Sequence, residues 1–223
     1  MARKTKEEAA ATRESILKAA LDLFSEKGYS GTTFSDIAKR IEMTRGAVYW
    51  HFENKEALLT ALVEFTHDYR DKLVETRVPD TKTLADLREA VVMYARVVAE
   101  DDLVRKMQFF LHLQMEWSQD LLKETNEKIS EIRRSHLEGF KQCFEVPQIQ
   151  PLLKEGTDLD QLVLILAALW MGTCNMFLAT CPFSEVESGS ELGRAWCDGL
   201  VKAIGDGFDM VMNGVLKEES GNE

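Results

Sequence analysis

The sequence predicts an all-α protein of about nine helices. Apolar residues recur three or four positions apart along almost the whole chain, as in Leu84, Leu87 and Val91, which is the spacing of one helix face. None of the four prolines precedes residue 79, so no proline breaks the first helical stretches. We expect no sheet, because no segment sustains the alternation of apolar and polar residues that a half-buried strand shows.

Composition and charge favour a globular protein. Hydrophobic residues make up 45% and charged residues 29% of the chain, which argues against disorder. No apolar run approaches the ~18 residues of a membrane span and no signal-peptide core follows the N-terminus, so we expect a cytoplasmic protein without a membrane partner. The net charge of −11 is uneven: residues 1–60 hold 10 basic and 9 acidic residues, and the remainder 17 and 29. One near-neutral end on an acidic body is compatible with DNA binding.

The N-terminal residues predict three helices with marked ends. The first spans Glu8–Lys27 and stops at Gly28. Thr33 begins a short helix, with Asp36 in the capping-box position, and Thr44 begins a second one. Isolated helices this short are marginal in water, so both must pack on the first helix. The result is a three-helix unit whose last helix projects from the surface.

That last helix carries a polar exposed face. Arg45, Tyr49 and His51 lie on it, beside the small residues Gly46 and Ala47, which allow the backbone to approach a groove wall. An arginine can donate two hydrogen bonds to guanine, and hydroxyl groups can bond phosphates. The pattern therefore favours a helix that reads the major groove of DNA.

The nine residues from Thr44 to Phe52, followed by Asn-Lys-Glu-Ala-Leu, resemble the DNA-reading signature of the TetR family. The start, Met-Ala-Arg-Lys-Thr-Lys-Glu-Glu-Ala with Thr-Arg-Glu-Ser-Ile-Leu following, resembles the efflux-pump repressors of its AcrR branch. The resemblance covers about residues 1–65. It implies a homodimeric repressor that leaves a palindromic double-stranded operator when a small hydrophobic or aromatic inducer binds, and that controls a multidrug efflux system.

The resemblance also implies a division of labour. Residues 1–53 would form the helix-turn-helix DNA-binding domain, and residues 54–223 the ligand-binding and dimerisation domain. Residues 54–77 would form a connecting helix, capped by Asn54. The inducer would displace this helix and so separate the two DNA-binding domains of the dimer. The expected DNA contacts are Thr33, Thr44, Arg45, Gly46, Ala47, Tyr49, His51 and Lys55.

Three positions in the DNA-binding head (residues 1–53) carry further expectations. Glu42 occupies the turn where the family usually has glycine; if that turn needs a positive φ, the glutamate costs about 1 kcal/mol. We expect Trp50 to be partly buried between helices, and Phe52 to lie in the core.

The C-terminal body is rich in aromatic and methionine side chains with a few polar groups between them. Such stripes are usually core, yet methionine surfaces adapt to varied ligands, and drug-sized pockets combine many apolar with few polar groups. The resemblance places His67, Gln108, His112 and Met171 on helices that line an inducer pocket. The expected pocket residues are His67, Gln108, Phe109, Phe110, His112, Trp117, Met171, Asn175 and Phe177.

The last two long helices, at about residues 158–179 and 191–216, are apolar at near-heptad spacing and need two neighbours, one of which is expected to be a second copy. In the family these two helices form a four-helix dimer interface. The expected interface residues are Leu159, Leu166, Trp196, Leu200, Ile204 and Phe208.

Other functional classes have less support. The chain lacks a P-loop, a G-x-S-x-G turn and an H-E-x-x-H motif, so we expect no enzyme, no cofactor and no metal. His112 and Glu116 could hold a metal only with a third ligand. Cysteines at 143, 174, 181 and 197 suit neither zinc nor a disulfide framework, which leaves redox sensing through Cys174 or Cys181 as an alternative. A helical adaptor without DNA or ligand would leave Arg45 and Tyr49 unexplained.

Overall fold

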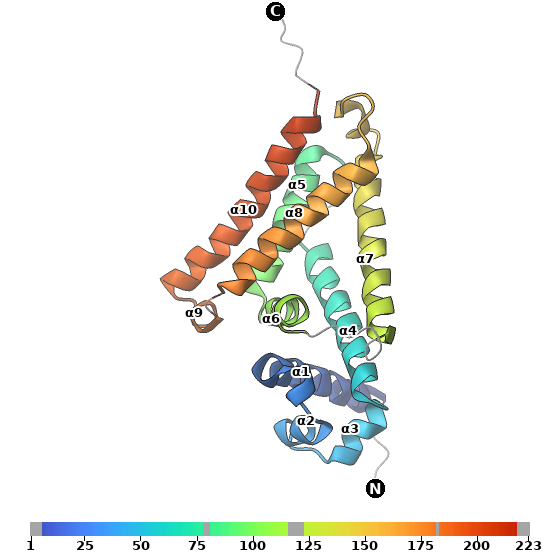
Figure 1. Ribbon diagram of the computed structural model, residues 1–223, viewed down its shortest axis with the longest axis vertical. Helices are drawn as coiled ribbons and strands as arrows, with labels where there is room; N and C mark the ends of the chain where they lie inside the picture. Colours follow the sequence, from blue (N-terminus) through green and yellow to red (C-terminus); the bar gives the residue numbers. More distant parts are fainter. Residues whose placement is uncertain (1–5, 78–80, 116–122, 182, 218–223) are drawn as a thin grey trace, which may run out of the picture. The chain divides into compact units, whose positions relative to one another are not determined.

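The computed structural model describes residues 6–77, 81–115, 123–181 and 183–217. Within these ranges the chain forms ten α-helices, a π-helical turn at Phe110–Gln114, a 3-10 turn at Gln150–Leu152 and one isolated β-bridge between Leu153 and Leu216 (Figure 1). The predicted all-α fold is confirmed. One helix more than expected is present, because the short α9 (Phe183–Glu187) forms where the sequence predicts a connection.

The chain divides into two compact units. The first comprises Met1–Arg70 and Leu103–Glu131, and the second Asp71–Asp102 and Ile132–Glu223. Two long helices, α4 (Lys55–Glu75) and α7 (Lys123–Phe144), therefore contribute residues to both units. These units are defined by contacts within the chain, whereas the division expected after residue 53 separates DNA binding from ligand binding. That functional division stays a prediction.

The first unit contains α1 (Lys6–Gly31), α2 (Phe34–Arg40), α3 (Arg45–His51), most of α4 and, from Leu103 on, α6 (Asp102–Phe109). Its core is made of fully buried aliphatic and aromatic side chains from these helices. They include Ile16, Leu17, Leu21, Phe24, Ile37, Val48, Leu58 and Leu62.

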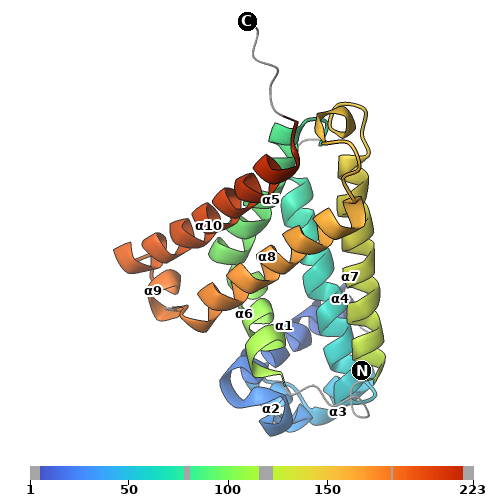
Figure 2. The ribbon, with the colours of Figure 1, turned by 45° about the horizontal axis from the view of Figure 1, so that its top comes forward.

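The second unit is built on α5 (Leu84–Glu100), α8 (Leu159–Ala179) and α10 (Glu191–Val215). In both ribbon views α10 runs alongside α5 (Figures 1 and 2). Arg88 on α5 pairs with Asp209 on α10 at 2.7 Å. Glycines allow α10 to approach its neighbours, since a Cβ on Gly207 would lie 2.7 Å from the side chain of Leu169 on α8. The buried cluster includes Leu87, Phe144, Leu162, Leu166, Phe208 and Met212.

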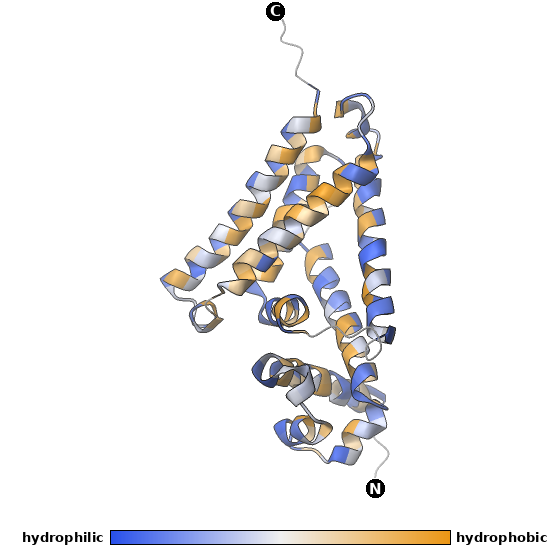
Figure 3. Cartoon of the chain, in the orientation of Figure 1, coloured by the Kyte–Doolittle hydropathy of each residue, from blue (hydrophilic) through white to orange (hydrophobic). Residues whose placement is uncertain are grey.

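One described helix, α8, is long and apolar enough to cross a membrane, judged by length and composition alone. In the structure 28% of its most apolar window is buried. The length and composition of this helix correct the expectation that no stretch approaches a membrane span. The helix is apolar along most of its length (Figure 3). Its outward residues Leu164, Ile165 and Met176 are 62%, 53% and 72% exposed. Exposed apolar side chains in a row of this kind mark a surface that contacts a partner.

Candidate DNA-binding site

α1 is the platform on which the two short helices pack. Gly28 has φ 76 and breaks the helical backbone at the predicted stop, and a short helical segment follows it to Gly31. The buried Thr32 hydroxyl donates to the carbonyl oxygens of Leu23 at 3.2 Å and Gly28 at 2.9 Å. These bonds close the end of α1 and set the position from which α2 begins.

The start of α2 is fixed by the predicted capping box. The Asp36 amide donates to Thr33 Oγ1 at 3.2 Å, and the Thr33 amide donates to Asp36 Oδ2 at 2.9 Å. Hydrogen bonds from the side chain and then the backbone of Thr33 lower the pKa of Asp36 to about 2. The Thr33 hydroxyl thus serves the helix cap, and a contact from it to DNA stays a prediction. At the other end of α2, Arg40 donates twice to Glu26 of α1.

The turn between α2 and α3 contains a residue with a positive φ, the conformation that a glycine at this place favours. Glu42 adopts φ 54, and no other non-glycine residue in the described ranges has a positive φ. A left-handed conformation costs a residue with a Cβ about 1 kcal/mol. The Met43 amide donates to the Ala38 carbonyl at 2.8 Å and holds the turn closed. The departure from glycine is therefore accommodated without loss of the motif.

α3 presents an arginine and a phenol together. Thr44 caps the helix by accepting a hydrogen bond from the Ala47 amide at 3.2 Å. One turn apart, Arg45 Nη2 donates to Tyr49 Oη at 3.0 Å, and the guanidinium lies 5.1 Å from the centre of the tyrosine ring. The ring rests edge-on against Phe34 of α2 at 4.8 Å. Both side chains are exposed and held in one orientation, as a pair that contacts bases or phosphates requires.

Trp50 lies on the surface, with 73% of its area exposed, so the expectation that it is partly buried is wrong. α3 has only seven residues and buries a single one, Val48, against the rest of the unit. Trp50 is therefore turned outward, with its ring 4.5 Å from that of the half-buried His51. The exposed surface of α3 is larger and more aromatic than its sequence predicts.

The Lys55 side chain makes its contacts within the first unit. Its ammonium donates to the carbonyl oxygens of Tyr29 at 2.7 Å and Thr32 at 3.1 Å, and lies 4.3 Å from the centre of the Tyr29 ring. Burial lowers the pKa of Lys55 and raises that of Tyr29 to about 12. The carbonyls at the end of α1 need donors, and the lysine supplies them. This arrangement gives Lys55 a structural role that the sequence did not predict, and the DNA contact expected of it stays a prediction.

The first unit also joins α6 and the π-helical turn directly to α1. Phe110 is fully buried and stacks on Phe24 with ring centres 5.3 Å apart. Gln114 Nε2 donates to the Ser25 carbonyl at 3.2 Å, and Lys106 lies 3.5 Å from Asp22. Phe110 is thus part of the core of this unit, and its assignment to a ligand pocket stays a prediction.

The remaining pocket candidates are placed as follows. In the first unit, His67, Gln108 and Phe109 are half-buried and His112 is exposed. In the second, Met171 is exposed, and Phe177 packs on Trp196 of α10 with ring centres 6.1 Å apart. Asn175 is half-buried, and its Oδ1 is a buried acceptor with no partner among the described residues. Trp117 lies outside the described residues.

The expected dimer residues are mostly buried inside one chain. Leu166, Leu200, Ile204 and Phe208 are at most 5% exposed without any partner, so they cannot add area to an interface. The family resemblance assigned these residues to a dimer interface, whereas within one chain α10 already packs on α5 and α8. Leu159 and Trp196 are half-buried, the latter donating to the Phe177 carbonyl at 3.1 Å. The outward row on α8 is an apolar surface that the sequence pattern did not single out.

Cys174, one of the two cysteines considered for redox sensing, is poorly suited to it. Burial raises the pKa of Cys174 to about 12, and also raises the pKa of Cys143. The reactive form of cysteine is the thiolate, so a buried thiol with a raised pKa reacts slowly with oxidants. Cys197 Sγ donates to the Ala99 carbonyl at 3.4 Å.

The sequence and the fold of this chain were compared with those of known proteins. Residues 16–62, which include every predicted DNA contact, match the model of the bacterial regulatory proteins of the tetR family. The regulator TtgR of Pseudomonas putida is 33% identical over 138 residues, which are 61% of this chain and 66% of that protein. NalD, the secondary repressor of the MexAB-OprM multidrug efflux pump in Pseudomonas aeruginosa, has a TM-score of 0.73 at 25% identity, covering 95% of this chain and 100% of NalD. The chain belongs to the TetR family.

A third relative extends this similarity. The complex of SmeT with triclosan has a TM-score of 0.67 at 29% identity and covers 93% of both chains. SmeT is the repressor of the Stenotrophomonas maltophilia multidrug efflux pump SmeDEF. The predicted resemblance to the efflux-pump repressors of the TetR family is therefore confirmed, with the match to TtgR spanning 66% of that protein's own length.

Proposed function

We propose that the chain is a transcriptional repressor that binds a palindromic operator through the exposed face of α3 and controls a multidrug efflux operon. The observation that supports this most is the Arg45–Tyr49 pair, held on an exposed helix within a head that matches the family model. An arginine at such a place donates to guanine, and the neighbouring hydroxyl donates to a phosphate. Relatives that repress efflux pumps support the choice of target genes.

A dimer is the binding species in this proposal. Two half-sites one helical turn apart require two reading helices, and one half-site alone is bound weakly. The outward row on α8, with Leu164, Ile165 and Met176, supplies an exposed apolar surface. We place the interface on this row, since the residues first expected there are already buried within one chain.

Release by a small apolar or aromatic inducer completes the proposed cycle. SmeT binds triclosan, which is a molecule of this kind. The unpartnered Oδ1 of Asn175 is an acceptor that a ligand donor would satisfy, since a buried polar atom without a hydrogen bond costs about 1–3 kcal/mol. α4 starts beside the head at Lys55 and ends in the second unit, so a tilt of this helix would reach the head.

Operator binding is tested with the DNA upstream of the chain's own gene. Wild-type protein is expected to protect a partly palindromic segment in a footprint and to retard it in a gel. Titration with triclosan, followed by a panel of apolar drugs and dyes, is expected to release the DNA. Linkage requires that operator weaken inducer binding by the same factor, corresponding typically to about 1–3 kcal/mol. Absence of sequence-specific protection contradicts the repressor function, and ligand binding that ignores operator contradicts the inducer role.

A further inference from the structure

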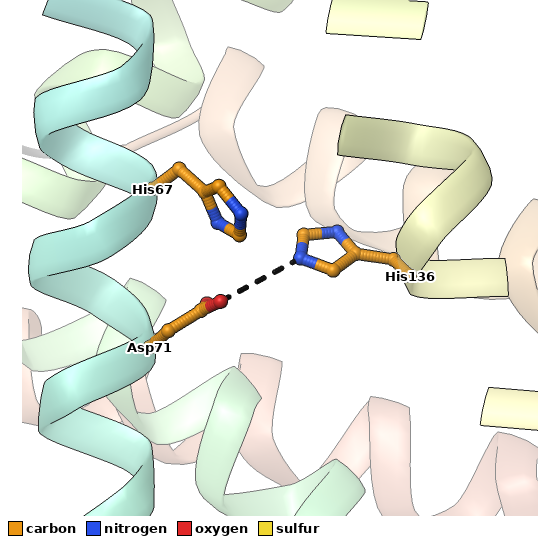
Figure 4. Close-up of side chains that lie close together, drawn as sticks. All are labelled: His67, Asp71 and His136. Carbon is orange, nitrogen blue, oxygen red and sulfur yellow. Dashed lines mark ion pairs between the residues drawn. The ribbon is translucent and has the colours of Figure 1, made fainter. Parts of the chain in front are cut away.

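A group of potential metal ligands lies on α4 and α7 (Figure 4). Asp71 Oδ2 is 3.8 Å from His136 Nε2, and both residues belong to the second unit. His67 precedes Asp71 by four positions on the continuous helix α4, so helix geometry alone places the two side chains on one face. Candidate ligand atoms of all three residues lie within 4.8 Å of one another.

We propose that His67, Asp71 and His136 form a binding site for a divalent transition-metal ion of the zinc type. Two imidazole nitrogens and one carboxylate oxygen are a ligand set that zinc accepts, with a fourth position left for water or another donor. Imidazole also suits cobalt and nickel, whereas magnesium and calcium prefer oxygen ligands alone. The ion would fasten Asp71, near the end of α4, to His136 of α7.

The distances fit an ion after small side-chain rotations. Zinc bonds to nitrogen and oxygen measure about 2.0–2.2 Å, which places tetrahedral ligand atoms about 3.3–3.5 Å apart. The Asp71–His136 distance is already close to this value, and a separation of 4.8 Å, the upper limit within the group, must shorten by about 1.3–1.5 Å. All three side chains are half-buried, so an ion can enter from solvent and still be partly protected from it.

Arg70 opposes the ion in the structure as it stands. Its Nη2 lies 3.0 Å from His67 Nδ1. A neutral imidazole carries one ring proton, so when Nδ1 accepts from Arg70 the proton is on Nε2, and neither nitrogen can bind a metal. Binding must therefore displace the Arg70 side chain. The arginine lowers the affinity of the site, and its removal should raise it.

The test uses the full chain, freed of metal with a chelator and kept without DNA. Calorimetric titration with zinc sulfate is expected to show one ion per chain, and cobalt chloride to give the visible absorption of a four-coordinate ion. Asp71→Asn and His136→Gln should each lower the affinity about tenfold or more, whereas Arg70→Met should raise it. Asp68→Asn is the control, because it removes an exposed carboxylate from the same helix as Asp71 but outside the group.

Thermal unfolding of each variant separates loss of the site from loss of the fold. Zinc should raise the melting temperature of the wild type and of Asp68→Asn, and leave that of Asp71→Asn unchanged. Failure of the folded wild type to bind zinc saturably overturns the site, as does equal binding by all variants. If Asp71→Asn alters stability while zinc binding persists, the Asp71–His136 contact is only an ion pair and the proposal is wrong. No outcome depends on DNA, so the repressor function is tested separately.

Discussion

Replacing Lys55 by methionine keeps the aliphatic stem and removes the ammonium that holds the end of α1. Two short hydrogen bonds disappear, to the carbonyls of Tyr29 and Thr32, together with the packing of the ammonium on the Tyr29 ring. A hydrogen bond from a charged donor contributes about 1.5 kcal/mol at the lower end of its range. The desolvation that lowers the pKa of Lys55 offsets part of this gain. We expect a net loss of about 2 kcal/mol in the free energy of unfolding.

Thermal unfolding followed by circular dichroism measures this loss. For a chain of this length, about 2 kcal/mol corresponds to a fall of roughly 4–8 °C in melting temperature. Lys18→Met is the matched control, because Lys18 forms only an exposed pair with Glu14 on α1 and should change stability by less than about 0.5 kcal/mol.

The salt dependence of operator binding distinguishes the two roles of Lys55. Each lysine that neutralises a phosphate adds about 0.9 to the steepness with which log affinity falls against log salt. The structure predicts that Lys55→Met leaves this slope unchanged at temperatures where the variant is folded. A variant with wild-type stability and a flattened salt slope would refute the structural reasoning and show that Lys55 instead makes the DNA contact expected of it, through a phosphate.

Three further changes have distinct expected outcomes. Asp36→Asn should destabilise the head at neutral pH; because the folded pKa of about 2 lies below the ordinary 3.8, the wild-type advantage should disappear as pH falls from about 4 to 2 in acid unfolding monitored by circular dichroism. Replacing Leu164 and Ile165 together by aspartate should give folded monomers in sedimentation that no longer bind operator, and a persistent dimer would exclude this face. Cys174 should react with a thiol reagent more slowly than Cys181 in the folded protein, and faster labelling of Cys174 would revive redox sensing.

Local signals made the head predictable. The cap at Thr33, the stop at Gly28 and the start of α3 at Thr44 depend on residues within a few positions of one another, and all three appear as the sequence predicts. The positive φ of Glu42 agrees with the family's usual glycine at this turn, although the sequence alone left that φ as a condition. The head is the part of the chain in which sequence and fold agree in most detail.

Partners distant in sequence were beyond prediction. A lysine at a helix start looks the same whether it binds a phosphate or carbonyl oxygens 23–26 residues away, and Lys55 does the latter. The periodicity of α10 shows that Leu200 and Ile204 share a face but not that this face meets α5. For the same reason an aromatic run could not reveal that Phe110 packs on α1.

The central claim, that the exposed face of α3 reads operator sequence, is tested most directly by comparing Arg45→Ala with wild type in fluorescence anisotropy. Each protein is titrated against labelled operator and against a scrambled duplex of equal length, at several salt concentrations. We predict that Arg45→Ala weakens operator binding by about 1–3 kcal/mol and narrows the difference between the two duplexes. Unchanged affinity for operator, with discrimination intact, would contradict the assignment of α3 as the reading helix.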